Sequence, residues 1–316
     1  MMPHLTRRTA LLGLGLAAAA RPVCAAPAPL RIGYQKFGSL VILRSQGTLE
    51  KLFAPQGVPV AWVEFNAGPP LLEALNAGAV DFGGTGDTPP IFAQAAGSSL
   101  QYVGAQPLRG EHEAILVREG SPVRTVADLR GRRVGYTRGS SAHNFVVKAL
   151  EQAGLALSDV QSVTLQPSDA AAAFRSGALD AWAVWDPFLA VAQQDPAARV
   201  LIQAKQVEPS NNFFLARRAW VASAPDQVTA LLGAINGAAG WAAANPDALA
   251  ELMTQVTGVP LAAQRVAVPR GTYAVQPMDD AIIAQQQGIA DTFARLRIIP
   301  ARIDVRQAVW TPPGRT

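Results

Sequence analysis

The stretch AVDFGGTGDTPPIFAQAA, residues 79–96, decides the fold. Residues 79–84 have the composition of a short strand that enters a glycine-rich turn, and Pro89-Pro90 suits the start of a helix over 91–96. Strands and helices alternate in the same way before it: we expect strands over 30–34 and 58–65, and helices over 40–52 and 69–76. This order is typical of a right-handed, parallel α/β sheet.

The same order of elements returns from residue 125. We expect a helical turn at 126–129, strands over 133–136, 160–165 and 181–185, and helices over 141–154 and 169–177. Two apolar stretches, 113–118 and 213–216, have the composition of crossings between the two units, and the mostly helical last hundred residues would complete the first unit. The chain is therefore predicted to form two lobes with a cleft between them, residues 30–114 with 215–316 and residues 115–214, joined by two hinge crossings.

Length and composition agree with two globular units. The chain has 316 residues, of which 49% are apolar and 16% charged, which excludes a disordered protein. Residues 1–25 contain no acidic residue, carry Arg7-Arg8 and continue into the apolar run 10–20, which is too short to span a bilayer. They are predicted to be a signal peptide cleaved after Ala25 that directs export to the periplasm. The residues around Arg7-Arg8 fit both an ordinary secretory signal and a twin-arginine signal.

Removal of this segment changes the charge of the protein. The 27 lysines and arginines lose Arg7, Arg8 and Arg21, which leaves 24 basic residues against 23 acidic ones and no support for a nucleic-acid partner. Cys24, the single cysteine, is lost as well, so a disulfide, a thiolate nucleophile and a cysteine-bound metal are excluded. The three histidines do not have metal-ligand spacing. We expect no catalytic residue, no metal and no cofactor.

Ligands of open α/β sheets bind beyond the carboxyl ends of the strands, where helices begin. Two loops of the first unit have this position. In the loop 34–39, Gln35 offers both hydrogen-bond donors and an acceptor. In the loop 83–90, Gly86, Asp87 and Thr88 precede a helix, where backbone N–H groups favour an anion; capping of that helix is the simpler role for Asp87.

Two loops of the second unit have the same position. Ser140, Ser141 and His143 stand at a helix start; the simpler roles are a cap for Ser140 and a surface residue for His143. Trp185 and Asp186 follow the next strand, where Trp185 would contact a ligand and Asp186 would meet an amine or bridge the lobes. All nine residues are candidate ligand-binding residues.

Several of these runs resemble the aliphatic sulfonate-binding proteins of ABC importers. The resemblance rests on the long runs 62–76 and 81–97, together with shorter ones at 31–36, 115–117, 121–122, 126–131, 139–143 and 180–188. It implies a two-lobed periplasmic binding protein of the Venus-flytrap type, a monomer without a cofactor. Such a protein delivers an alkanesulfonate to a permease and ATPase at the inner membrane for sulfur metabolism.

The resemblance also implies roles for the loops. Thr88, Ser140 and Ser141, with Gln35, would hold the sulfonate oxygens, and Trp185 would contact the carbon skeleton. Asp87-Thr88, Ser141-Ala142 and residues 108–112 depart from the pattern of the family, so a related ligand remains an alternative: taurine, an aromatic sulfonate, nitrate, bicarbonate or a pyrimidine precursor. An enzyme on the same fold, for example a dehydratase or a pyrimidine synthase, is the other alternative and would need a committed acid–base pair, such as Asp87 with Asp186.

Overall fold

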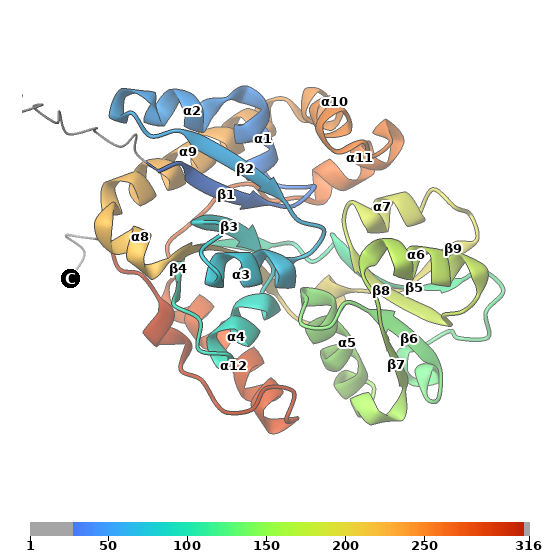
Figure 1. Ribbon diagram of the computed structural model, residues 1–316. Helices are drawn as coiled ribbons and strands as arrows, with labels where there is room; N and C mark the ends of the chain where they lie inside the picture. Colours follow the sequence, from blue (N-terminus) through green and yellow to red (C-terminus); the bar gives the residue numbers. More distant parts are fainter. Residues whose placement is uncertain (1–27, 313–316) are drawn as a thin grey trace, which may run out of the picture.

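The computed structural model describes residues 28–312, which fold into two lobes, each around a five-stranded mixed sheet (Figure 1). The first sheet has the order β2-β1-β3-β10-β4, with strands β1 (Leu30–Tyr34), β2 (Val60–Glu64), β3 (Phe82–Thr85), β4 (Leu100–Leu108) and β10 (Ser210–Arg217). The second has the order β7-β6-β8-β5-β9, with strands β5 (Glu113–Arg118), β6 (Arg133–Tyr136), β7 (Gln161–Thr164), β8 (Ala181–Trp185) and β9 (Ala198–Gln203). The predicted two-lobed α/β fold is confirmed.

The helices divide between the same two lobes. The first lobe holds α1 (Ser39–Gln46), α2 (Thr48–Phe53), α3 (Gly68–Asn76), α4 (Thr88–Ala95), α8 (Arg218–Ser223), α9 (Pro225–Ala244), α10 (Pro246–Thr257), α11 (Leu261–Ala267) and α12 (Asp280–Arg295). The second holds α5 (Ser141–Gln152), α6 (Pro167–Ser176) and α7 (Phe188–Ala192). The helix expected over 40–52 is two helices, because Gly47 adopts a left-handed conformation with φ 60° and ends α1.

The expectation that 113–118 and 213–216 cross between the lobes is wrong. Both stretches lie inside sheet strands, β5 and β10, and each strand runs antiparallel to both of its neighbours. A chain that arrives from the other lobe meets a sheet at its cleft edge, where the parallel strands end, so it must enter in the opposite direction. Each sheet is therefore mixed, with a parallel part, β2-β1-β3 or β7-β6-β8, and an antiparallel part that the sequence did not predict.

The connections themselves are short. Residues 109–112 join β4 to β5, and residues 204–209 join β9 to β10. We therefore propose that the chain changes lobe within these two segments, slightly before the expected boundaries at 114/115 and 214/215. β10 in particular belongs as a whole to the first sheet, since it pairs with β3 and β4 along its length.

Helices of the C-terminal third pack on both faces of the first sheet. One face of the first sheet is covered by α1, α9 and α10, whose buried side chains Leu43, Ile235 and Met253 join one core cluster with Ile32 and Phe82. The other face packs against α3 and α12 in a second cluster. Within residues 28–312, no helix has both the length and the apolarity needed to cross a bilayer. The expected signal segment 1–25, with Cys24, lies outside the described residues.

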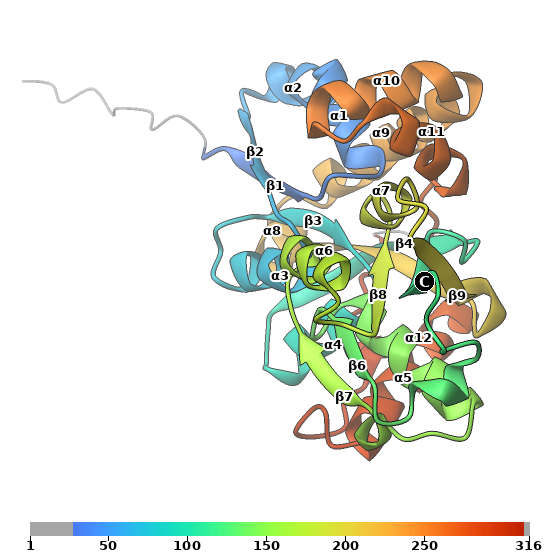
Figure 2. The same cartoon turned by 90° about the vertical axis from the view of Figure 1, so that its right-hand side faces the viewer.

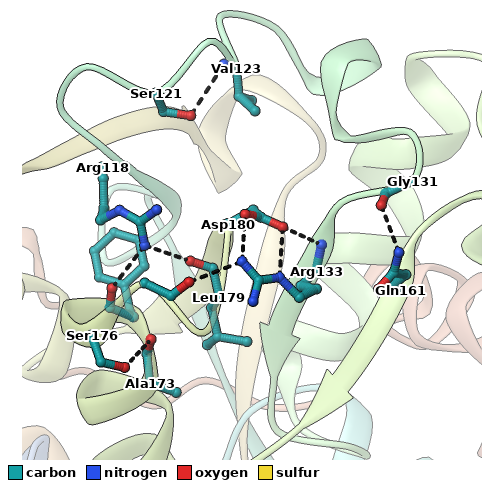
Figure 3. A network of polar contacts seen from close by, with 12 residues as sticks. Arg118, Ser121, Val123, Gly131, Arg133, Gln161, Ala173, Ser176, Leu179 and Asp180 are labelled. Atoms are coloured by element: carbon teal, nitrogen blue, oxygen red, sulfur yellow. Dashed lines mark hydrogen bonds and ion pairs between the residues drawn. The ribbon is translucent and has the colours of Figure 1, made fainter.

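Each sheet is held by an arginine–aspartate pair at the end of its strands opposite the cleft. Asp81, just before β3, accepts hydrogen bonds from the backbone N (2.9 Å), Nε (3.0 Å) and Nη2 (2.9 Å) of Arg31 on β1. Asp180, just before β8, accepts the same three bonds from Arg133 on β6, at 2.8, 3.1 and 2.9 Å (Figure 3). The two lobes therefore repeat one structural device as well as one order of elements.

The two pairs differ in burial. The Asp81 side chain is only 5% exposed and receives a second guanidinium, Arg217, whereas the Asp180 side chain is 22% exposed and has Arg133. Burial alone would raise the pKa of Asp81, but the hydrogen bonds from Arg31 and Arg217 outweigh it and hold that pKa below its ordinary value. Loss of the Asp81 carboxylate, which pairs with Arg31 and Arg217, should therefore cost more stability than loss of the Asp180 carboxylate, which pairs with Arg133.

We expect Asp81→Asn to lower the free energy of unfolding by about 3 kcal/mol, because it leaves two guanidinium groups without their carboxylate. The matched variant Asp180→Asn should cost clearly less. Urea unfolding at pH 7 measures both. Because the folded-state pKa of Asp81 is depressed, the wild-type advantage should be complete above the ordinary aspartate pKa of about 3.9 and shrink as the pH falls through the folded-state pKa. Equal losses for the two variants would contradict the assignment.

Candidate ligand-binding cleft

A cavity of about 110 Å³ lies between the two lobes. The first lobe contributes residues of β3, β4 and β10 and of the loops before α1 and α3, and the second contributes residues around the start of α5 and the end of β8. Its polar lining comes from both lobes: Gln35, Lys36, Ser39, Asn66, Thr85, Gln106, Asn212 and Thr272 on one side, and His112, Ser140, Ser141 and Asp186 on the other.

Four helices of eight or more residues begin at this cavity, and the short helix α7 begins there as well, at Phe188. Ser39 starts α1, Gly68 starts α3, Pro89 lies in the first turn of α4 and Ser141 starts α5, and all four residues line the cavity. The N–H groups in the first turn of a helix have no acceptor within the helix, and the helix dipole places partial positive charge there. The cleft is therefore electrostatically suited to an anion, although the lining contains a single fully charged basic side chain, Lys36.

Two glycines of the lining allow close approach of the backbone. A Cβ atom at Gly68 would lie 1.9 Å from Thr85 Oγ1, so only glycine lets α3 start against β3. A Cβ atom at Gly86 would lie 3.0 Å from Ser141 Cβ, which belongs to the other lobe. The backbone after β3 and the N-terminus of α5 thus meet face to face across the cleft.

Several buried polar atoms of the cavity lining have no hydrogen-bond partner among residues 28–312. They are Thr85 Oγ1, Gln106 Nε2, His112 Nδ1 and Asp186 Oδ2. Buried polar groups are nearly always hydrogen-bonded in folded proteins, and the exceptions gather where a ligand or water completes the site. Residues of the lining thus carry unused donors and acceptors in addition to the helix N-termini.

Six of the nine predicted residues line the cavity: Gln35, Gly86, Ser140, Ser141, Trp185 and Asp186. Gln35 is anchored by its Nε2, which donates to the Gly84 carbonyl at 3.1 Å. Ser140 occupies the N-cap position of α5, as the simpler alternative had it, but its hydroxyl donates to the Thr137 carbonyl at 2.7 Å and makes no capping bond. The Ser141 hydroxyl donates to Glu113 Oε1 at 2.8 Å. Trp185 packs edge-on against Phe188, with the ring centroids 6.3 Å apart.

Asp87 and Thr88 lie behind the cavity lining. Both are buried, and the Thr88 hydroxyl donates to Asp87 Oδ1 at 2.7 Å. The Asp87 side chain makes no capping bond to α4, against the simpler expectation; Asn144 Nδ2 of the other lobe donates to its Oδ2 at 3.4 Å. Burial raises the pKa of Asp87 to about 7. Asp87 therefore contacts the second lobe through Asn144, at a position outside the cavity lining.

His143 is a buried aromatic contact between the lobes and lies outside the cavity lining. Its ring stacks on Tyr136 at a centroid distance of 4.9 Å and faces Phe293 of the first lobe at 5.2 Å. Its Nδ1 accepts from the Gly139 N–H at 3.3 Å, and burial lowers the pKa of the imidazole to about 4. The alternative of a surface histidine is wrong, since the residue is 3% exposed.

Asp186 bridges the lobes. Its Oδ1 accepts from the Ala190 N–H at 3.0 Å and lies 3.5 Å from Nη1 of Arg270, a first-lobe residue whose Nη2 donates to Gln193 at 2.8 Å. Burial raises the pKa of Asp186 to about 6 although the Arg270 charge opposes the shift. Next to this bridge, α7 lies against α11, where Ala190 packs on Ala263 and Ala267 (Figure 2).

Some lining residues were not predicted. Gln106 and Asn212 are opposed residues of β4 and β10, joined by an Asn212 Nδ2 to Gln106 Oε1 bond of 3.2 Å. In the sequence, each would be recognised as a polar residue within an apolar strand. Gln106 could not be chosen in this way, because no strand was expected over the residues of β4. Thr85, between two glycines of the decisive stretch, could have been chosen on that ground. Arg270 has no local signal, because its partner is 84 residues away.

Comparisons with known proteins agree with this geometry. The NMT1/THI5-like family matches residues 51–249. A putative aliphatic sulfonates-binding protein of Escherichia coli K12 is 41% identical over 291 residues, which cover 90% of each chain. The alkanesulfonate-binding protein SsuA from Xanthomonas axonopodis pv. citri, solved with bound MOPS, superposes with a TM-score of 0.86 at 42% identity and covers 90% of this chain and 99% of its own.

The fold alone has a wider distribution. The desulfurization enzyme DszB superposes with a TM-score of 0.64 at 19% identity over 88% of this chain, so the architecture by itself does not separate binding from catalysis. The identity to the sulfonate-binding relatives over nine-tenths of the chain does separate the families. By that measure, and as the runs 62–76 and 81–97 predicted, the chain belongs to the family of aliphatic sulfonate-binding proteins.

Proposed function

We propose that the protein is an extracytoplasmic solute-binding protein that captures an alkanesulfonate in the cleft and delivers it to the permease of an ABC importer. The observation that carries this proposal is the convergence of the N-termini of α1, α3, α4 and α5 on one cavity between the lobes. A sulfonate is a permanent anion with three acceptor oxygens, so it suits several N–H and O–H donors that share its charge. The relatives named for sulfonates support the same ligand class.

The two ends of the cavity suit the two ends of such a ligand. The sulfonate oxygens would be held at the start of α5, by Ser140 and Ser141 and the backbone there, with Gln35 and the backbone of Gly86 from the facing lobe. The carbon skeleton would contact the apolar part of the lining, where Trp185 and Phe188 stand. Asp87, Thr88 and His143 would contribute by holding the lobes together behind the ligand.

Closure would follow from contacts of one ligand with both lobes. A ligand that touches both lobes favours the closed state by its differential affinity. The Asp186–Arg270 and Asp87–Asn144 contacts would add to that state. The closed protein would then dock on a permease and its ATPase at the inner membrane, as a monomer in the periplasm. No catalytic step is required for this function. Of the two carboxyls considered as an acid–base pair, Asp186 lines the cavity and Asp87 lies behind the lining.

The ligand class is tested by a thermal-shift screen of the mature protein against alkanesulfonates, taurine, aromatic sulfonates, nitrate, bicarbonate and sulfate. Buffers must contain no sulfonate, because a relative is solved with MOPS. An alkanesulfonate at a hundred times its Kd should stabilise the protein by about 2.7 kcal/mol. A rise in melting temperature with nitrate or bicarbonate, and no rise with any sulfonate, would contradict the proposal.

The anion site is tested by the double variant Ser140→Ala with Ser141→Ala. The proposal requires the Ser140 hydroxyl to turn from the Thr137 carbonyl, and the Ser141 hydroxyl from Glu113, toward the ligand. Loss of both contacts to a charged group should then weaken sulfonate binding by roughly ten- to a hundredfold in isothermal titration calorimetry, at about 1.5 kcal/mol or more per charge-assisted hydrogen bond. Ser162→Ala, on the exposed strand β7, is the matched control and should bind as the wild type does. Unchanged affinity of the double variant would move the sulfonate away from α5.

Gly86→Ala tests whether close approach of the lobes is needed for binding. The added methyl group would meet Ser141 across the cleft at 3.0 Å, so we expect about tenfold weaker binding, while each lobe folds normally. Gly240→Ala in α9, where an added Cβ meets nothing within 4 Å, is the control and should leave binding unchanged. Full affinity of Gly86→Ala would show that the ligand does not depend on this contact.

A further inference from the structure

Ser141 is connected to a buried carboxyl group that the proposed function does not use. Glu113 is the first residue of β5 and lies opposite Trp185 in the β5–β8 ladder. It is 2% exposed, and its Oε1 accepts the Ser141 hydroxyl at 2.8 Å. Glu113 does not itself line the cavity, whereas Ser141 does. The Glu113 carboxyl group is therefore connected to the cavity through a single hydrogen bond, the one from Ser141.

The hydroxyl of Ser141 has a single proton to donate. An ionised Glu113 can only accept a hydrogen bond, and so can a sulfonate. With Glu113 ionised, the proton points to the carboxylate, and the serine turns a lone pair toward the anion. With Glu113 protonated, its own O–H donates to Ser141 Oγ, and the serine proton is free to point into the cleft.

We propose that Glu113 positions the Ser141 hydroxyl, so that a sulfonate binds to the protein with Glu113 protonated, and binding takes up a proton there at any pH at which Glu113 is ionised in the free protein. The inference rests on the proposed function, because it requires a sulfonate at the start of α5. It makes Glu113 a positioning residue that acts on the ligand through Ser141.

The acidic groups around Glu113 act in the same direction. The charge of Asp87, a first-lobe residue, raises the pKa of Glu113, and Glu208, which accepts a hydrogen bond from Asn144 on α5 at 3.1 Å, raises the pKa of Asp87 in turn. Burial, with the charge of Asp87, raises the pKa of Glu113 to about 8, while the Ser141 hydrogen bond opposes the shift. A carboxyl in these surroundings already holds its proton near neutral pH, and an adjacent anion holds it more firmly.

Most other charged groups on the neighbouring elements are paired elsewhere. Arg138, in the loop before α5, has no ion pair among residues 28–312, and its charge acts on Tyr136 and His143. On α5, Lys148 Nζ lies 3.7 Å from Glu208. Beyond β8, Asp186 is paired with Arg270, and His112, next in the chain to Glu113, has a pKa lowered by burial to about 4. After β9, Lys205 is paired with Glu111 at 2.9 Å on the surface. Within residues 28–312, therefore, no cation is hydrogen-bonded or ion-paired to Glu113.

The sign of the pH dependence follows. The bound state holds the Glu113 proton more tightly than the free state, so its pKa rises on binding. Affinity should be complete below the free-state pKa of about 8 and should fall as the pH rises through it, by up to tenfold per pH unit until the bound-state pKa is reached.

Isothermal titration calorimetry with 1-butanesulfonate tests the inference. Titrations at pH 6 to 9 are run in pairs of non-sulfonate buffers with different ionisation enthalpies, for example Tris and borate at pH 8.5, and the difference in heat gives the protons taken up. The wild type should take up close to one proton per ligand at the upper end of this range. Glu113→Gln, whose amide donates to Ser141 permanently, should take up none and should bind about tenfold more tightly than the wild type at pH 9.

The control variant is Glu251→Gln on the exposed side of α10, which should keep the wild-type uptake. If the wild type binds butanesulfonate without proton uptake, or if Glu113→Gln keeps the uptake while Asp87→Asn loses it, the inference is overturned and the proposed function survives. Absence of sulfonate binding at every pH overturns the proposed function instead. Should Glu113→Gln fail to fold, Ser141→Ala takes its place: it should lose most of the proton uptake, and full retention overturns the inference.

Discussion

The close approach of Gly86 and Ser141 is the contact on which the rest of the site depends. It brings the backbone after β3 within van der Waals reach of the first residue of α5, so one anion can touch both lobes. The clamps Arg31–Asp81 and Arg133–Asp180 stand at the opposite ends of the same strands and hold each sheet in register. Because the strands of each sheet are held in register, the carboxyl ends of β3 and β8 and the starts of α1, α3, α4 and α5 all lie at the cleft.

The cavity lining contains no guanidinium. The starts of α1, α3, α4 and α5, serine hydroxyls and a glutamine surround the cavity; Lys36, the cation of the lining, lies 3.7 Å from Glu64, and Arg270 is engaged with Asp186 and Gln193. Distribution of the ligand charge over several weak donors suits release as well as capture, because no single strong ion pair has to be broken. When the ligand charge is shared among few donors, the orientation of each hydroxyl matters for affinity. A serine whose O–H points to the anion stabilises it, whereas a serine that turns its lone pair to the anion repels it.

Local chemistry explains which features could be predicted from the sequence. Loops that follow a strand and lead into a helix are visible in the sequence at 34–39, 83–90, 137–144 and 181–188, and they led to Gln35, Gly86, Ser140, Ser141, Trp185 and Asp186, all at the cavity. The direction of β5 and β10 was missed because strand direction depends on where the chain comes from. Glu113, Arg270 and Gln106 were missed because their partners lie 28, 84 and 106 residues away. His143 was misplaced because its aromatic neighbour Phe293 lies on a distant helix.

The most direct measurement of the central claim is a crystal structure of the mature protein with 3-bromopropanesulfonate, in which anomalous scattering from bromine marks the organic end of the ligand. We expect the sulfonate oxygens to lie within hydrogen-bond distance of the Ser140 and Ser141 backbone or hydroxyl groups. The bromine should lie at the end of the cavity that Trp185 lines. A ligand bound in the reverse orientation, or a sulfonate outside the cavity between Gly86 and Ser141, would contradict it.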